Sequence, residues 1–493
     1  MDILKSSLKE ISTAVRTKKI SAKEVAEFYM KRAHLHNPKL NAYITMNESV
    51  LEQASDIDSR IAKGEDVSAK KLLGVPFGIK DMLCTKGIKT TAASKILENF
   101  IPPYDATVVG RIKSNGGLIL GKLNQDEFAM GSSNETSFYG LVRNPWDLDR
   151  VPGGSSGGSA AAQSAGLAAA TIGTDTGGSI RQPASYCGVV GVKPTYGRVS
   201  RYGIIAYASS LDQAGPMVNT VEDAALVLES ICGFDKMDST TSQRSDFQFS
   251  QNINKSVKGL KIGVLKEFFS DQLDADVKKA LELAIENLKK QGAEIVEVSI
   301  PLTKHAVPIY YLIASSEASS NLSRYDGVKF GYRHDFKDLS SVSLDSFYSK
   351  TRGDGFGSEV KRRIIMGTYC LSSGYYEAYY GKASQVRRML KAQFNEVFKS
   401  CDALISPVST TPAFKIGERI DDALAMYLND IFTVSTNLAG IPGMSIPYAL
   451  SQKNLPIGIQ LMCKDFDEQK MLNIASALEE TSPVRGAQPK GFE

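Results

Sequence analysis

The sequence predicts an α/β fold, and three observations support this prediction. Residues 260–264, 274–290 and 293–298 read in turn as a strand, an amphipathic helix and an alternating strand, an order typical of α/β proteins. Short apolar runs typical of buried strands recur on both sides of this unit. The 493 residues suffice for several average domains or one large α/β unit, and 42% hydrophobic with 23% charged residues is ordinary for a globular protein.

The first 70 residues are expected to form an N-terminal helical segment packed on the core. Two helices are predicted within residues 1–36, and Ser21 and Glu24 have the S-x-x-E spacing of a capping box at the start of the second helix. Another helix is predicted over residues 49–63.

Residues 71–480 are expected to form the main domain, followed by a C-terminal tail at 481–493. Residues 235–257 are polar and lack periodicity, which predicts a surface excursion and not a domain boundary. Residues 320–375 are polar and rich in Gly and Tyr, which predicts loops and short helices over a pocket. The predicted strands are 72–80, 116–123, 171–175, 188–193, 260–264, 293–298, 402–406, 443–448 and 456–462. The predicted helices are 107–115, 160–170, 221–233, 274–290, 379–398 and 468–478.

Charge and cysteine content argue against several classes of protein. The chain has 58 basic and 54 acidic residues, and a net charge of +4 is too weak to predict a basic face that binds nucleic acid. Six scattered cysteines without a CxxC predict reduced thiols in a cytoplasmic protein, and four histidines without a paired cluster predict no metal site. No signal-peptide core or long apolar run is visible, so no membrane association is expected.

The stretch 152–183, PGGSSGGSAAAQSAGLAAATIGTDTGGSIRQP, contains two Gly/Ser clusters separated by an Ala-rich run. Glycine lets backbone N–H groups approach a ligand closely, and a Gly-rich loop that opens a helix suits an anion or a developing oxyanion. We therefore expect Ser179 to be a nucleophile and Ser155 its relay.

Three other interpretations of this stretch are weaker. A flexible linker would not carry a helix-length Ala run. A phosphate-binding P-loop requires a Lys after the glycines, which is absent. Residues 153–157 match the G-x-S-x-G nucleophile elbow, but a loop precedes them and the histidines downstream, His305 and His334, lie in polar surroundings.

Residues 72–80, LLGVPFGIK, predict a short buried strand that ends in Lys80. A lysine in this position is usually a solvated strand end. If the strand carries it into the interior, burial favours the neutral amine, which is a competent general base. From the residues alone both interpretations stay open.

These motifs resemble the amidase signature family, and the resemblance extends from about Leu72 to Met462. It implies one large α/β domain with a mixed central sheet wrapped by helices. It also implies a Ser–cisSer–Lys triad formed by the nucleophile Ser179, the bridging Ser155 and Lys80. The backbone donors of the oxyanion hole would then lie at Thr176, Gly177 and Gly178.

Within that family the chain is similar to the A subunits of tRNA-dependent amidotransferases, through residues 314–327, 355–380 and 429–443. The likeness implies that Arg363, or its neighbour Arg362, binds the α-carboxylate of glutamine and that Asp430 binds the α-amine. It also implies a place for Met130 in the substrate site. Arginine suits this role because it can bind a carboxylate with two N–H groups. From sequence alone, a surface ion pair is the more usual interpretation of either charge.

The resemblance implies a glutaminase that forms an acyl intermediate on Ser179 and releases ammonia. A B subunit would bind the aminoacyl-tRNA and use the ammonia with ATP and Mg²⁺ to convert Glu-tRNA(Gln) to Gln-tRNA(Gln), or Asp-tRNA(Asn) to Asn-tRNA(Asn). A small C subunit would complete a heterotrimer, and the chain itself would need no cofactor. Two alternatives are a stand-alone amidase acting on another small amide and a non-enzymatic scaffold with a decayed site.

Overall fold

The computed structural model describes residues 1–268, 273–419 and 422–493, and an 11-stranded mixed sheet runs through them. The strand order is β1-β3-β2-β4-β6-β5-β10-β11-β9-β7-β8. The pairs β3–β2, β2–β4, β9–β7 and β7–β8 are parallel and the other pairs are antiparallel. The strands are β1 (Tyr43–Met46), β2 (Pro76–Lys80), β3 (Leu118–Leu123), β4 (Ala170–Asp175), β5 (Val190–Lys193), β6 (Gln213–Val218), β7 (Lys261–Leu265), β8 (Glu294–Val298), β9 (Ala403–Pro407), β10 (Gly443–Leu450) and β11 (Pro456–Cys463).

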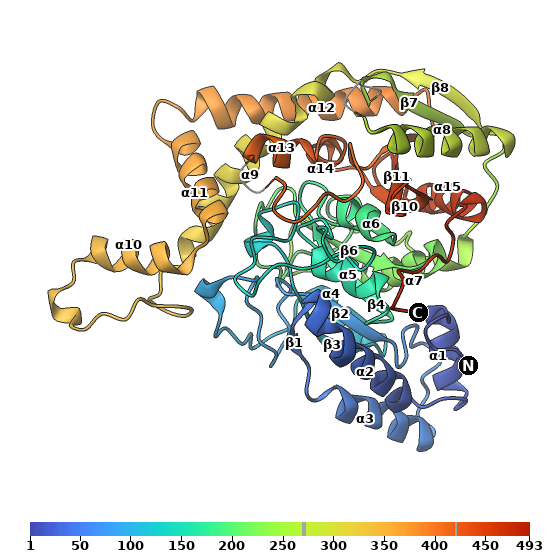
Figure 1. Cartoon of the computed structure of the whole chain (residues 1–493), viewed down its shortest axis with the longest axis horizontal. Coiled ribbons are helices and arrows are strands. Elements are labelled where there is room, and N and C mark those ends of the chain that lie inside the picture. The colour runs from blue at the N-terminus through green and yellow to red at the C-terminus, as the bar shows by residue number, and fades with distance from the viewer. Residues whose placement is uncertain (269–272, 420–421) are drawn as a thin grey trace.

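Helices flank this sheet, so the predicted fold class is confirmed (Figure 1). Helices α2 and α3 lie beside strands β2 and β3 at one end of the sheet, and α1 contacts α7. At the other end α8 lies beside β7 and β8, and α10 projects from the body. The helices are α1 (Leu8–Arg16), α2 (Ala22–Leu40), α3 (Val50–Ala62), α4 (Thr107–Ser114), α5 (Gly157–Ser164), α6 (Arg181–Cys187), α7 (Val221–Ile231), α8 (Ala275–Lys290), α9 (Ala306–Asn321), α10 (Leu344–Gly355), α11 (Ser358–Leu371), α12 (Lys382–Val397), α13 (Ala423–Leu428), α14 (Val434–Ala439) and α15 (Glu468–Thr481).

The carboxyl ends of β2 and β4 bring two predicted site segments together. The two strands are parallel neighbours, with Ile79 opposite Ile172, and every residue of both is buried. Lys80 is the last residue of β2 and Asp175 the last residue of β4. Carboxyl ends of parallel strands share one edge of a sheet, where open α/β proteins bind their ligands. Lys80 therefore lies beside the loop that leads from β4 to Ser179.

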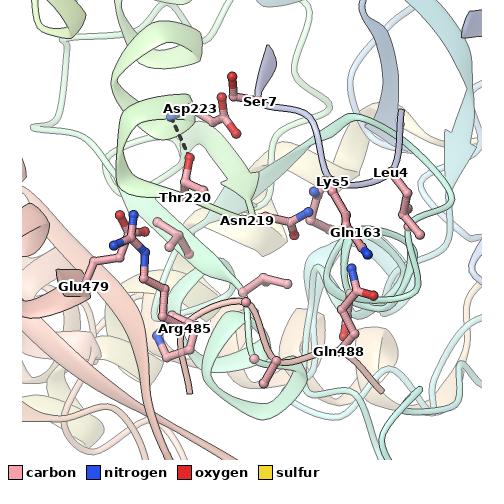
Figure 2. Close-up of a pocket in the computed structure, with 18 of the residues that line it drawn as sticks. Leu4, Lys5, Ser7, Gln163, Asn219, Thr220, Asp223, Glu479, Arg485 and Gln488 are labelled. Atoms are coloured by element: carbon pink, nitrogen blue, oxygen red, sulfur yellow. Dashed lines mark hydrogen bonds between the residues drawn. The ribbon is translucent and has the colours of Figure 1, made fainter. Parts of the chain in front are cut away.

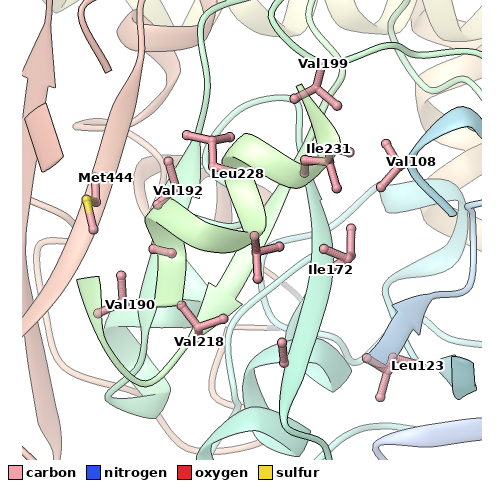
Figure 3. Close-up of a cluster of buried hydrophobic side chains, with 14 of the residues drawn as sticks. Val108, Leu123, Ile172, Val190, Val192, Val199, Val218, Leu228, Ile231 and Met444 are labelled. Atoms are coloured by element: carbon pink, nitrogen blue, oxygen red, sulfur yellow. The ribbon is translucent and has the colours of Figure 1, made fainter. Parts of the chain in front are cut away.

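A continuous apolar core holds these strands in place. Val190 and Val192 of β5, Val218 of β6, and Leu228 and Ile231 of α7 are buried in one cluster (Figure 3). Strands covered on both faces read as almost uninterrupted apolar runs, and this explains why several of them are visible in the sequence.

The prediction of one helix over residues 160–170 is wrong in its second half. Helix α5 ends at Ser164, and Ala170 already begins β4. Gly166 lies between them with φ 62°, a left-handed conformation that terminates a helix. The N-terminal segment that was predicted to be helical also contributes β1, which pairs with β3.

Strand β6, with the sequence QAGPMV, was not predicted. Gly and Pro lower its intrinsic strand propensity, and its conformation is instead fixed by pairing with β4 on one side and β5 on the other. A Cβ on Gly215 would lie 1.9 Å from the Val192 carbonyl oxygen, so the close approach of β5 and β6 requires glycine there.

The polar segment and the C-terminal tail are held by hydrogen bonds to helices and loops that flank the sheet. In the polar segment 235–257, Asp235 accepts hydrogen bonds from Thr107 and Ser200. In the tail, Phe492 is buried and its carbonyl accepts a hydrogen bond from Arg32 at 2.5 Å. Across the described ranges, no helix combines the length and apolarity needed to cross a membrane.

Candidate active site

Lys80 lies in the protein interior with no solvent exposure, so its interpretation as a solvated strand end is wrong. Burial lowers the pKa of Lys80 to about 7, although the charges of Asp126, Asp175 and Asp212 partly oppose that shift. An amine with this pKa is present in its neutral form at physiological pH, as a general base must be.

The contacts of Lys80 Nζ suit an amine that gains and loses a proton. Nζ lies 2.8 Å from Ser155 Oγ, 2.8 Å from Ser156 Oγ and 3.4 Å from the Thr174 carbonyl oxygen. Ser156 donates its own hydroxyl hydrogen to the Thr174 carbonyl, 3.0 Å away, and therefore accepts from Nζ. With two N–H groups directed at Ser156 and Thr174, the lone pair of the neutral amine faces Ser155. After protonation, all three oxygens can accept from the ammonium.

Ser155 and Ser179, the predicted bridging serine and nucleophile, lie on two loops that contact each other. Ser155 follows a cis peptide bond and is fully buried, and the Ser156 N–H donates to the Ser179 carbonyl at 3.1 Å. Ser179 is 8% exposed, so it is the triad member that a substrate can reach. All residues from 151 to 163 are buried, which excludes the flexible-linker interpretation.

Asp175 fixes the start of the Ser179 loop. Its carboxylate accepts hydrogen bonds from Nε and Nη2 of Arg181, both at 3.0 Å, and from Asn437 Nδ2 at 2.9 Å. Burial alone would raise the pKa of Asp175, but the Arg181 guanidinium outweighs burial and holds that pKa well below its usual range. The carboxylate is thus ionised and accepts the Gly178 N–H at 2.8 Å.

This last bond separates the predicted oxyanion donors. The Gly178 N–H is directed at Asp175, whereas the N–H groups of Thr176, Gly177 and Ser179 form no hydrogen bond within the described residues. Those three groups are therefore the ones free to stabilise an oxyanion, and Ser179 replaces Gly178 in the predicted set.

Two side chains pack directly against the glycines of this loop. A Cβ on Gly177 would lie 2.6 Å from the Tyr310 ring, and a Cβ on Gly178 would lie 2.2 Å from Thr433 Oγ1. Gly178 also has φ 134°, which side chains other than glycine rarely adopt. Both positions therefore require glycine, because the loop is covered closely by α9 and by the start of α14.

Arg363 is a buried cation at the same site, with 3% exposure, and the surface ion-pair interpretation is wrong for it. Nε donates to Glu359 at 2.7 Å and Nη1 donates to the Tyr207 hydroxyl at 2.5 Å. No hydrogen bond from Nη2 forms in the described part of the chain, so its two N–H groups are free to bind an anion. The side chain of Arg362 is 54% exposed, which identifies Arg363 as the inward-facing residue of the two.

Asp430 supplies a buried anion, with 7% exposure. Oδ2 accepts a hydrogen bond from Ser132 at 2.6 Å, and within the described residues Oδ1 accepts none. Burial raises the pKa of Asp430 to about 7, and the charge of Arg363 is among the influences that oppose this shift. A bound cation would therefore favour its ionised form. Met130, predicted in the substrate site, is fully buried two residues before Ser132.

The structure links these charges to the nucleophile loop. Thr433, three residues after Asp430, donates to the Gly177 carbonyl at 2.7 Å. Gln182 donates to the Ser132 carbonyl at 3.0 Å and accepts the Gly154 N–H at 3.0 Å. Loops from four parts of the sequence therefore converge on the edge of the sheet at Lys80.

Sequence reasoning missed several residues of this site. Ser156 stands next to Ser155 in GGSSGG and could have been considered as a second partner of the lysine. Ser132 lies in a small-residue loop, which is a weak signal. Tyr207 carries no sequence signal, because its role depends on the distant Arg363.

A cavity of about 410 Å³ lies away from these residues, between the N-terminal segment and the C-terminal tail (Figure 2). Its lining includes Lys5, Gln163, Asp223, Glu479 and Arg485. Of the residues that the structure describes, none of the predicted site residues lines this cavity. The convergence of Lys80, Ser155 and Ser179 therefore remains the candidate active site.

Comparison with known proteins agrees with this geometry. The family model described as Amidase matches residues 24–472. The chain belongs to the amidase family. The resemblance predicted from the sequence is thereby confirmed, and the triad residues lie inside the matched region.

Among relatives of this amidase, the A subunit of glutamyl-tRNA(Gln) amidotransferase from Bdellovibrio bacteriovorus is 66% identical, with 99% of both chains covered. The protein of the same name from Alkalilimnicola ehrlichii is 54% identical, covering 98% of this chain and 99% of its own. The crystal structure of the corresponding A subunit from Thermotoga maritima is 42% identical with a TM-score of 0.81, covering 98% and 96% of the two chains. Peptide amidase from Stenotrophomonas maltophilia is 28% identical with a TM-score of 0.83, covering 99% of each chain.

We expect kcat for amide hydrolysis to fall as the pH is lowered through about 7. Lys80 can accept a proton only when neutral, so below its pKa of about 7 the activity decreases about tenfold per pH unit. The quantity to measure is kcat at saturating substrate, because titration of Asp430 in the free protein affects kcat/KM. A kcat that stays constant from about pH 8 to 6 in folded protein would contradict a general-base role for Lys80.

We also expect Ser156→Ala to lower kcat about 5- to 150-fold. The substitution leaves a buried Lys80 N–H without its acceptor, at a cost of about 1–3 kcal/mol. Ser159→Ala is the matched control, since Ser159 is a buried serine of α5, the helix that Ser156 directly precedes. Ser159 donates to the Ile172 carbonyl and has no hydrogen bond to Lys80 within the described residues. Equal losses in steady-state assays of the two variants would show that Ser156 has no specific role.

Proposed function

We propose that this chain is the glutaminase subunit of a tRNA-dependent amidotransferase. In this proposal it hydrolyses glutamine and supplies the ammonia for converting Glu-tRNA(Gln) to Gln-tRNA(Gln), or Asp-tRNA(Asn) to Asn-tRNA(Asn). The observation that supports it best is the buried pair Arg363 and Asp430, each with an unused polar atom, linked by hydrogen bonds to the Ser179 loop.

A free amino acid needs one charge of each sign in its binding site. Nη2 of Arg363 offers two N–H groups to the α-carboxylate, and Oδ1 of Asp430 offers an acceptor to the α-ammonium. Glu359 pairs with Nε of Arg363, so the charge of Arg363 is partly compensated without a ligand. Within the described residues Nη2 of Arg363 and Oδ1 of Asp430 still form no hydrogen bond, and a zwitterion of opposite arrangement complements these two atoms. Glutamine adds the side-chain amide that amidase chemistry requires.

The hydrogen bond between Lys80 and Ser155, and the backbone bond that holds the Ser155 and Ser179 loops together, support the following reaction. Ser179 Oγ attacks the side-chain amide carbon, its proton passes to Ser155, and the proton of Ser155 passes to Lys80. The N–H groups of Thr176, Gly177 and Ser179 stabilise the oxyanion, and one such donor contributes about 3–4 kcal/mol. The proton returns through Ser155 to the departing nitrogen, ammonia leaves, and a glutamyl ester remains on Ser179.

Water completes the cycle by attacking the ester. It gives its proton through Ser155 to Lys80 as the second oxyanion forms, and Ser179 regains a proton when glutamate leaves. A histidine is not required, because the buried amine of Lys80 is the base throughout.

The partners in this proposal are two further chains, a B subunit together with a small C subunit. Support comes from relatives that match over 99% of their length and are named as the A subunit of glutamyl-tRNA(Gln) amidotransferase. We place the aminoacyl-tRNA, ATP and Mg²⁺ with the B subunit, in keeping with the small net charge of +4 on this chain. The complex would act in the cytoplasm.

We expect Arg363→Ala to lower kcat/KM for glutamine about 10- to 150-fold while changing hydrolysis of a primary amide without an α-carboxylate much less. The expected loss corresponds to a charge-assisted hydrogen bond of about 1.5–3 kcal/mol. Arg362→Ala is the matched control, because Arg362 is exposed on the same helix. If glutamine kinetics are the same in both variants, Arg363 does not bind the substrate.

Ammonia release distinguishes a component of an amidotransferase from a free-standing amidase. We expect glutamine hydrolysis by the purified chain to rise when B and C subunits are added, and to disappear in Ser179→Ala. With Glu-tRNA(Gln) and ATP present, the released nitrogen should appear in Gln-tRNA(Gln). Rapid hydrolysis of many simple amides, unchanged by the partners, would instead identify a stand-alone amidase.

A further inference from the structure

Asp212 is a buried carboxylate beside the oxyanion loop that the proposed reaction does not yet use. It directly precedes β6, whose first residue Gln213 lies opposite Asp175. Its exposure is 2%, and burial raises its pKa to about 6, so it is ionised at neutral pH. Asp175 is paired with Arg181. The side chain of Asp212 instead accepts hydrogen bonds from a hydroxyl and from backbone N–H groups.

These donors belong to two different parts of the site. Oδ1 accepts the Thr176 hydroxyl at 2.6 Å, and Thr176 begins the oxyanion loop. Oδ2 accepts the N–H groups of Tyr207 at 3.0 Å and Ala208 at 3.1 Å. The hydroxyl of the same Tyr207 accepts Arg363 Nη1 at 2.5 Å. One carboxylate thus connects the loop that holds the oxyanion with the segment that holds the buried arginine.

We propose that Asp212 is a positioning residue that couples binding of the substrate carboxylate at Arg363 to the placement of the oxyanion loop. This inference rests on the proposed function. A carboxylate at Arg363 orients the guanidinium, Tyr207 follows through its hydroxyl, and Asp212 transmits the position of the Tyr207–Ala208 backbone to Thr176. Hydrogen bonds in a connected network polarise one another, so each contact strengthens the others.

The charge of Asp212 also acts on the general base. Lys80 is subject to three carboxylates, Asp126, Asp175 and Asp212, and each favours its protonated form. Asp126 accepts hydrogen bonds from the Thr136 hydroxyl and the Asn134 N–H, and Asp175 accepts them from Arg181. The charge of Arg201 is among the influences that lower the pKa of Asp212. Removing the Asp212 charge therefore makes Lys80 easier to deprotonate. In the profile of kcat against pH, the acidic limb, where kcat falls because Lys80 is protonated, moves to lower pH.

Asp212→Asn tests this charge effect with nearly unchanged shape. We expect kcat to fall at least tenfold, because the amide group cannot accept all the N–H and O–H groups around it. We also expect the acidic limb, measured with a simple primary amide, to move to lower pH. Asp223→Asn is the matched control: Asp223 is also a buried carboxylate that accepts a backbone N–H, from Leu8, and it does not act on Lys80. Its limb should coincide with that of the wild type.

Thr176→Val and Tyr207→Phe test the coupling without altering Asp212. If Asp212 joins the two residues, their effects on kcat/KM for glutamine are not additive, whereas on the simple amide, which lacks the carboxylate, they are additive. Thr176→Ser keeps the hydroxyl and should restore most of the activity lost in Thr176→Val.

An acidic limb that Asp212→Asn leaves unmoved overturns the charge effect, and additive losses on glutamine overturn the coupling. The simple-amide measurements do not depend on glutamine being the natural substrate. If the proposed function is wrong, the wild-type enzyme will not prefer glutamine over the simple amide, and this result is separate from those of the variants. Thermal melting of each variant confirms that folded proteins are compared.

Discussion

The site depends on one constraint, the burial of the Lys80 amine without a hydrogen-bonded carboxylate. A buried lysine paired with an acid would stay charged and could not serve as a base. Nζ here contacts Ser155, Ser156 and the Thr174 carbonyl, and these oxygens serve both protonation states. The nearby carboxylates act through space and keep the pKa close to neutrality, not far below it. The amine can therefore take a proton from Ser155 and return it within one turnover.

The sheet makes this burial possible. Parallel strands β2 and β4 end at one edge, and their completely buried residues carry Lys80 inward while delivering the Ser179 loop beside it. The same edge contains a second buried lysine, Lys122 on β3, which lies 3.6 Å from Asp81. Lys122 also donates to the Leu83 carbonyl and to the Thr90 hydroxyl. The two lysines therefore differ in the nearby carboxylate: Asp81 lies within ion-pair distance of Lys122, whereas no carboxylate of the described residues lies within that distance of Lys80.

The parts of the site that sequence predicts are those carried by local motifs. Glycine clusters and a strand ending in lysine placed Ser155, Ser179 and Lys80, and apolar runs predicted most of the sheet. The burial of Lys80 could not be predicted, because a lysine after an apolar run looks the same in the sequence whether its side chain lies in water or in the core. Strand β6 could not be predicted, since tertiary pairing overrides the propensity of QAGPMV.

One long-range contact and one local contact account for the remaining differences. The inward orientation of Arg363 over Arg362 depends on Tyr207, which lies 156 residues away. The occupation of the Gly178 N–H depends on an ionised Asp175, and thus on its pairing with Arg181. The orientation of Arg363 has no local sequence signal. The second feature arises within residues 175–181, but the sequence does not show which N–H group the carboxylate accepts. Both determine which atoms remain free for a substrate, so they decide function more directly than the motifs do.

The most direct test is an NMR titration of the Lys80 amine, with isotope-labelled lysine and assignment by the Lys80→Arg variant. The structure predicts a midpoint at about 7, well below the pKa of an ordinary lysine. A Lys80 resonance that remains that of an ammonium above about pH 9 would contradict the account, because no neutral base would then exist under the conditions of catalysis.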